Sequence, residues 1–359
     1  MNLFKKRKPK DIRREIAPQL TSYQRRDLER AGASPAGLPY SVYERMQQDS
    51  MIQTVLGVKK QGVLAVPWEI LPGDGSPAAR EAADFAELAF SRMEGSPHTI
   101  MHGAMDAFAK GWSIQELVWG FDGGRVWLRA VRPKDPGAFG VEVDPFGRIK
   151  ALRLELPGEQ ARELPREKFV IYSNRAAYGK PKGKSDLDAA YRHWQAKTAL
   201  LEAWQIHLER FAMPTVLGKY DRSIPAEEQT ELLRHLEDLH KVTALTFPNE
   251  IEVDTLGGAK EPSTGFMEAI DFHNREISRA VLGQTLTTDE GRRVGSLAMG
   301  KVHLQVLLLQ LQAIRRELAD AVMTEGVIRP LVELNFGQVP VPRFQFQETG
   351  MDAFVTGRI

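Results

Sequence analysis

The stretch GKSDLDAAYRHWQAKTALLEAWQIHLERF, residues 183–211, decides the architecture that this sequence predicts. Ser185 is a residue type that caps helix N-termini, and apolar residues then recur at the 3.6-residue spacing of one helix face. Pro214 ends the pattern. About 27 helical residues at 1.5 Å each make a rod of about 40 Å. A rod of this length exceeds the average helix of a globular domain.

A second amphipathic helix is predicted at about 264–282, and a small insert separates it from the first. The insert has strand patterns at 215–219, 244–247 and 251–255 around a helix at 226–240. Two rods joined by a small domain leave wide apolar sides, for which further copies of the chain are the simplest partner. The residues expected at that interface are Trp194, Leu201, Trp204, Leu208, Phe266, Ile270, Ile277 and Val281.

The part that precedes the rods is predicted to be an α+β domain. Its helices are expected at 41–64, 77–93 and 97–110, with a short strand at 65–71. The pattern then alternates with a period of two, which predicts strands at 113–119, 125–131, 139–143, 149–156 and 169–173. Asp122-Gly123-Gly124 lies between the first two of these strands and is typical of a hairpin turn.

A charged loop at 286–295 follows the second rod. It leads into a helix at 296–324 that is apolar on most sides and therefore belongs in a core or a subunit interface. This helix continues through 328–336, and a last strand is predicted at 343–347. The loop is either a solvated connection or a finger that presents Arg292 and Arg293 to a polyanion. Its other candidate contact residues are Thr288, Asp289 and Glu290.

Composition limits the classes of function. The 359 residues carry a net charge of +1 and no cysteine, so disulfides and thiolate chemistry are excluded. No stretch is apolar for long enough to predict a membrane span, and no secretory signal is expected. Residues 1–14 hold seven basic residues against one acid. The N-terminal 39 residues are therefore either a solvated tail or an arm that wraps a neighbour or touches nucleic acid.

Two motifs suggest chemistry, and neither is complete. Gly179–Ser185 has the context of a phosphate loop, but three residues separate its glycines where that motif needs four. His98, His102 and Asp106 share a helix face and could begin a metal site, yet no fourth ligand is evident. We therefore predict no catalytic residue, no metal, no cofactor and no enzymatic activity, with a nucleotide-handling enzyme built on Gly179–Ser185 as the alternative.

The order of these elements resembles the portal proteins of tailed bacteriophages, specifically the Mu-like portal family. The resemblance covers roughly residues 40–350 and depends on their combined order more than on any single motif. The residues that carry it are Tyr43–Asp49, Pro67–Ile70, Gly111–Trp119, Arg132-Pro133, Gly183–Leu187 with Trp194 and Lys197, Glu209–Pro214 and Ile277–Gln284.

The resemblance implies a ring, usually of twelve subunits, with named parts. It makes 1–39 an N-terminal arm, 40–182 the wing, and 183–212 and 262–284 the two stem helices. The clip is then 213–261, the tunnel loop 285–296, and the core helix and last strand of the wing 297–348. Family members often end in a helical crown, whereas only a short tail, 349–359, follows here.

The same resemblance implies a structural role at one capsid vertex of the virion, with assembly in the host cytoplasm. The ring would be the channel through which double-stranded DNA is packaged and ejected, touching the phosphate backbone without base readout. The implied protein partners are the terminase large subunit, the major capsid or scaffolding protein and a head–tail adaptor, with no membrane. Another helical head–tail scaffold protein, which would lack the stem–clip–stem hairpin, remains a further alternative.

Overall fold

A computed structural model describes residues 34, 36–177, 180–212, 215–219, 225–238, 252–256, 263–285 and 297–347. The chain divides into two compact units, which are described one at a time. The first combines Met1–Tyr191 with Ile277–Ile359, and the second is Arg192–Glu276. Two long helices, α7 (Leu187–Ala212) and α9 (Ser263–Leu282), each belong partly to both units.

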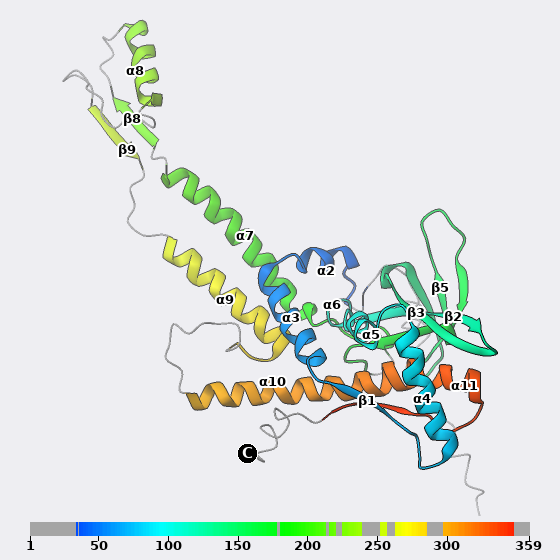
Figure 1. Ribbon diagram of the computed structural model, residues 1–359. Coiled ribbons are helices and arrows are strands. Elements are labelled where there is room, and N and C mark those ends of the chain that lie inside the picture. Colours follow the sequence, from blue (N-terminus) through cyan, green and yellow to red (C-terminus); the bar gives the residue numbers. More distant parts are fainter. Residues whose placement is uncertain are drawn as a thin grey trace, which may run out of the picture. The chain divides into compact units, whose positions relative to one another are not determined.

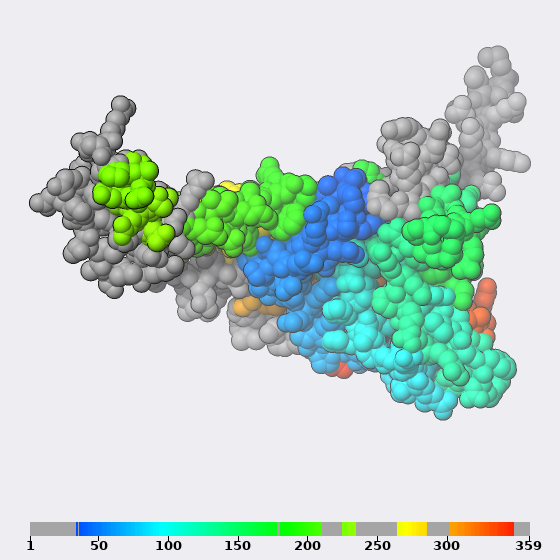
Figure 2. Space-filling model, turned by 90° about the horizontal axis from the view of Figure 1, so that it is seen from above, coloured from blue at the N-terminus to red at the C-terminus, as the bar shows by residue number. Residues whose placement is uncertain are grey.

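The N-terminal half of the first unit is a helical layer followed by antiparallel strands (Figure 1). Its helices are α2 (Tyr40–Met46), α3 (Ser50–Leu64), α4 (Pro77–Arg92), α5 (Pro97–Ala104) and α6 (Ala107–Lys110). In the space-filling view, the blue α2–α3 segment and the cyan α4–α5 segment form one continuous surface (Figure 2).

The described strands of the first unit form three small antiparallel sheets. Strand β2 (Trp112–Asp122) lies between β3 (Arg125–Lys134) and β7 (Phe169–Ser173). A second sheet has the order β4 (Phe139–Val143), β5 (Ile149–Leu154) and β6 (Arg162–Pro165), and β1 (Trp68–Leu71) pairs with β10 (Arg343–Phe346). The predicted β2–β3 hairpin is confirmed, and Gly123 and Gly124 turn it with φ of 58° and 77°.

The C-terminal part of the first unit supplies its central helix. Helix α10 (Leu297–Glu317) runs directly into a π-helix, η3 (Leu318–Ile328), and then into α11 (Arg329–Phe336). The π-helix packs against β7, β10 and α5, and its Val322, Met323, Val327 and Ile328 are completely buried. The core of this unit therefore forms where the last part of the chain meets strands from its first half.

The described part of the second unit holds α7 from Arg192 onwards, α8 (Ala226–Asp238) and α9 as far as Glu276. Strands β8 (Thr215–Lys219) and β9 (Glu252–Leu256) pair antiparallel. The strand predicted at 244–247 and the tail 349–359 lie outside the described residues, as do the loop 286–295 and the first 33 residues of the N-terminal arm.

Several predicted boundaries are wrong, each for a local reason. The single helix expected at 41–64 is two helices. The Asp49 carboxylate accepts hydrogen bonds from the amides of Met51 (2.9 Å) and Ile52 (3.2 Å), and this N-cap begins α3 as a separate helix. The helix expected at 97–110 breaks at Met105 into α5 and α6. Strand β6 was not predicted, because its RELP sequence is polar and sits at a sheet edge.

Candidate oligomer interface

In the second unit, α7 and α9 lie side by side and hold each other through aromatic side chains (Figure 1). The rings of Trp204 and Phe266 are nearly parallel, 10° apart in plane, with centroids 6.5 Å apart. The imidazole of His207 lies 5.6 Å from the same phenylalanine. These contacts stabilise a hairpin of two helices. Two helices alone cannot bury all of their apolar side chains against each other.

A second contact between the two helices is a histidine pair. Nδ1 of His193 on α7 lies 3.1 Å from Nδ1 of His273 on α9. Because Arg192 donates to Nε2 of His193 (3.3 Å), the proton of His193 is on Nδ1, which donates to His273. Partial burial, Arg192 and His273 each lower the pKa of His193. Two protonated imidazoles would place two donors face to face and break the contact.

We expect the α7–α9 hairpin to loosen as the pH falls through the ordinary histidine range. The folded pKa of His193 is below its unfolded value, so the unfolded state binds more protons and stability declines with acidification. After correction for the slower intrinsic exchange at low pH, the protection of amides in 192–212 and 263–276 against hydrogen exchange should fall severalfold from pH 7.5 to pH 5.5. In His273→Leu this pH dependence should weaken, because burial and Arg192 still lower the pKa of His193, and an unchanged profile in that variant would contradict the role of the pair.

Large apolar side chains remain exposed on both helices of the hairpin. On α7 the exposed fractions are 38% for Leu201, 53% for Ile206 and 46% for Leu208. On α9 they are 42% for Met267 and 48% for Phe272. Clustered exposed aliphatic and aromatic groups mark surfaces that another protein covers. Both helices predicted to carry apolar residues on their outer sides therefore expose such residues in the structure.

The eight predicted interface residues fall into three groups. Leu201 and Leu208 are exposed. Trp194, Trp204, Phe266 and Ile270 are half-buried. Ile277 and Val281 are 0% and 1% exposed and already belong to the core of the first unit, so they are not available to a neighbouring chain. The candidate channel residues Thr288, Asp289, Glu290, Arg292 and Arg293 lie outside the described residues.

Helix α10 offers a further apolar surface, in the first unit. Val302, Leu304, Val306 and Leu309 are 56%, 41%, 41% and 52% exposed, whereas Leu307 and Leu311 are buried. Val302, Val306 and Leu309 are spaced as i, i+4 and i+7 and so share one face. Helix α10 is therefore apolar on both its buried and its exposed face.

The root of α7 is fixed by a buried charged network that the sequence analysis missed. The Asp186 carboxylate, whose side chain is 0% exposed, accepts Nζ of Lys59 at 2.5 Å and Nδ2 of Asn174 at 3.0 Å. Nη2 of Arg175 lies 3.3 Å from it. A signal was present in the sequence, because Lys59 occupies the apolar face of α3 between the buried Val55 and Val63. A lysine in that stripe indicates a buried partner.

Residues of the two incomplete motifs, Gly179–Ser185 and His98/His102/Asp106, have structural roles in the first unit. The Ser185 hydroxyl donates to the Ala109 carbonyl (2.6 Å) and accepts the Leu187 amide (3.0 Å), so it starts α7 as predicted for a capping residue. Asp106 forms an ion pair with Lys60 (2.6 Å). Among the described residues, no three histidine or acidic side chains are placed to hold a metal ion, and no helix is long and apolar enough to cross a membrane.

Comparison with known families identifies the class of protein. A family model described as the portal protein of Mu bacteriophage matches residues 40–353. The chain belongs to this portal family. This confirms the resemblance that the order of elements indicated, and with it the α+β, portal-like fold class.

Two relatives of this portal-family chain are similar along most of its length. It is 27% identical over 322 residues to the Mu-like prophage FluMu protein gp29 of Haemophilus influenzae, covering 87% of the chain and 61% of that protein. It is 25% identical over 329 residues to the portal protein of Escherichia phage Mu, covering 89% of the chain and 61% of that protein. The chain thus spans about three-fifths of the length of these relatives.

The fold is also that of a solved neck structure. The neck of the native gene transfer agent particle, computed with C12 symmetry, superimposes with a TM-score of 0.65 at 13% identity. The match covers 92% of this portal-family chain and 89% of that chain. At this level of identity the likeness shows the fold alone.

Proposed function

We propose that this chain is the repeating subunit of a portal ring at one vertex of a phage-like capsid, through which double-stranded DNA enters and leaves. The observation that carries the proposal is the uncovered apolar surface on α7, α9 and α10 in a chain of the portal family. Contacts between different faces of identical copies close into a ring when the rotation between them divides a full turn. The C12 symmetry of the structurally similar neck supports twelve copies.

We expect the purified protein to form rings with a central hole and twelve subunits. Electron-microscopy class averages and mass photometry measure this directly. Leu201→Glu with Leu208→Glu should shift the protein to monomers, because each change would place a carboxylate in the apolar interface. Glu202→Gln, a charge change at an exposed position of the same helix off the face of Leu201 and Leu208, is the control and should leave rings intact. A stable monomer at high concentration for the parent protein would overturn the ring proposal.

The DNA contact is assigned to the tunnel loop, 285–296, on the strength of its sequence. Arg292 and Arg293 are expected to touch phosphates transiently, since a near-neutral chain suits passage of DNA better than capture. Arg292→Ala with Arg293→Ala should reduce packaged DNA severalfold while rings still form. Normal packaging and normal DNA retention in that variant would remove the loop from the DNA pathway.

The remaining partners follow from the same proposal. The clip, 213–261, would meet the terminase large subunit during packaging and a head–tail adaptor afterwards, and the wing would meet the major capsid or scaffolding protein. In this proposal the protein belongs to the virion after assembly in the host cytoplasm.

The geometry of the described part of 179–185 disfavours the alternative of a nucleotide-handling enzyme. The Ser185 hydroxyl is committed to Ala109 and Leu187, and the Lys182 side chain is buried against Trp112, with Nζ 5.4 Å from the ring centre. A phosphate cradle needs such groups directed outwards to a ligand. The portal proposal therefore predicts that neither the parent protein nor its Lys184→Ala variant binds ATP.

A further inference from the structure

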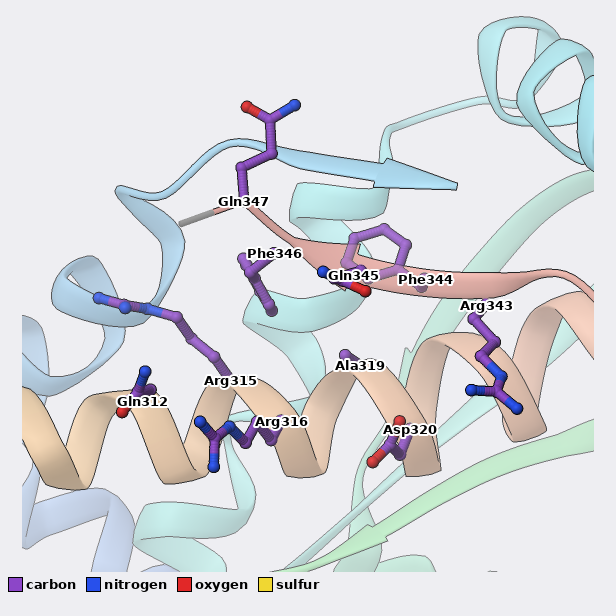
Figure 3. Close-up of a pocket in the computed structure, with 10 residues that line it drawn as sticks. All are labelled: Gln312, Arg315, Arg316, Ala319, Asp320, Arg343, Phe344, Gln345, Phe346 and Gln347. Atoms are coloured by element: carbon purple, nitrogen blue, oxygen red, sulfur yellow. The ribbon is translucent and has the colours of Figure 1, made fainter. Parts of the chain in front are cut away.

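A groove of about 310 Å³ separates strand β10 from the helix formed by α10 and η3 (Figure 3). One wall is the strand, from Arg343 to Gln347. The opposite wall is the helix, where Gln312, Arg315, Arg316, Ala319 and Asp320 line the space. The groove lies entirely within the first unit. The function proposed above does not involve it.

The edge of β10 that borders the groove is not paired with a strand in the described part of the chain. Among the described strands its sheet consists of β1 and β10, and the Gln347 amide donates to the Pro67 carbonyl (2.9 Å) on the β1 side. Because backbone groups alternate along a strand, Phe344 and Phe346 point their amides to the other side. The Phe344 amide donates there to the Thr324 hydroxyl (3.0 Å). The Phe346 amide and carbonyl are directed towards the groove.

The charge of the groove selects the kind of segment that could enter it. Three arginines and one aspartate line it. Arg315 is nearly buried and donates from Nη2 to the Gly62 carbonyl (3.0 Å), which fixes its position, whereas Arg316 and Arg343 are exposed. Figure 3 shows the guanidinium groups spread along the groove instead of converging on one point. This distribution fits several separate carboxylates better than a single small anion.

We propose that this groove binds an extended acidic segment of a partner protein, which adds to β10 as a third strand. Strand addition at an open edge gives affinity through main-chain hydrogen bonds, here to Phe346 and to the Phe344 carbonyl. Side chains of the added strand that carry carboxylates then meet Arg316 and Arg343. The basic N-terminal arm of this chain, with seven basic residues and one acid in its first 14, has the wrong charge for this site.

A labelled heptapeptide of alternating glutamate and valine tests the proposal by fluorescence anisotropy on the full chain in its assembled state. We expect a Kd below about 1 mM, and no binding of the matching lysine–valine peptide. Arg316→Glu with Arg343→Glu should weaken binding at least tenfold. Arg80→Glu, at an exposed position of α4 away from the groove, should leave it unchanged.

Residue-resolved hydrogen exchange separates strand addition from simple charge attraction. The acidic peptide should slow exchange of the Phe346 amide and leave that of Gln347, already bonded to Pro67, as it was. Binding that depends on the arginines without protecting Phe346 would overturn the proposal, as would equal binding of the lysine peptide or none of the acidic one. A Phe346 amide already protected before peptide addition would mean that another copy fills the groove, which also overturns it.

Discussion

Asp186→Ala is expected to destabilise the first unit by about 3–5 kcal/mol, the usual consequence of removing one partner from a buried ion pair. The Lys59 ammonium is 2.5 Å from the Asp186 carboxylate, with side-chain exposures of 6% and 0%. Burial already lowers the pKa of Lys59 although Asp186 opposes that shift. Without Asp186 the ammonium would be buried without the carboxylate that contacts it directly and offsets its lost hydration. Chemical denaturation of the variant and the parent protein measures the difference.

The neighbouring pair Lys60–Asp106 provides a matched control for this prediction. Its Nζ to carboxylate distance is 2.6 Å, but the side chains are 14% and 51% exposed. Asp106→Ala should therefore cost no more than about 1 kcal/mol. Asp186 raises the pKa of Lys59 against the effect of burial, so the folded pKa of Lys59 should be lower still in Asp186→Ala, and the deficit should shrink as pH rises towards the ordinary lysine pKa. Equal losses in the two variants would show that burial of the pair is not what matters.

The sequence predicted the parts of this fold that depend on local pattern. The spacing of apolar residues placed α4, α7 and α9 within one or two residues, and the Gly123-Gly124 turn placed the first hairpin. The π-helical geometry of η3 was not predictable, because seven of its eleven positions are apolar and so dense a pattern does not distinguish 3.6 residues per turn from more. The pairing of β1 with β10 joins segments more than 270 residues apart, which no local signal specifies.

The candidate interface shows the same division. Periodicity selected Leu201 and Leu208, which are exposed, together with Ile277 and Val281, which lie on the continuing stripe of α9 but are buried in the first unit. An apolar stripe on a helix indicates that this face is buried in the mature protein. It does not indicate whether the same chain or another chain buries it. That choice depends on where the C-terminal helix packs, and only the three-dimensional structure supplies this information.

Gly183→Ala is expected to be the other severe substitution, with a loss of at least about 3 kcal/mol, because two separate effects add. Gly183 has φ of +60°, where an L-residue is disfavoured, and a Cβ at this position would lie 2.5 Å from the Gly111 carbonyl oxygen and closer still to that of Asn174. Both neighbours are backbone atoms held in place, since the Asn174 amide donates to Gly111 (2.8 Å) and the Lys184 amide to Asn174 (2.7 Å). They cannot move aside without breaking the root of α7.

A second glycine separates the steric effect at Gly183 from the effect of backbone conformation alone. Gly123 has nearly the same φ, +58°, and nothing lies within 4 Å of a Cβ added there. Gly123→Ala should therefore lose only about 1–2 kcal/mol, the price of the left-handed conformation. Thermal unfolding and ring formation of the two variants should differ accordingly, with Gly183→Ala failing to assemble and Gly123→Ala assembling normally. Similar losses would mean that the backbone around Asn174 adapts, and that the start of α7 is less rigidly fixed than its hydrogen bonds indicate.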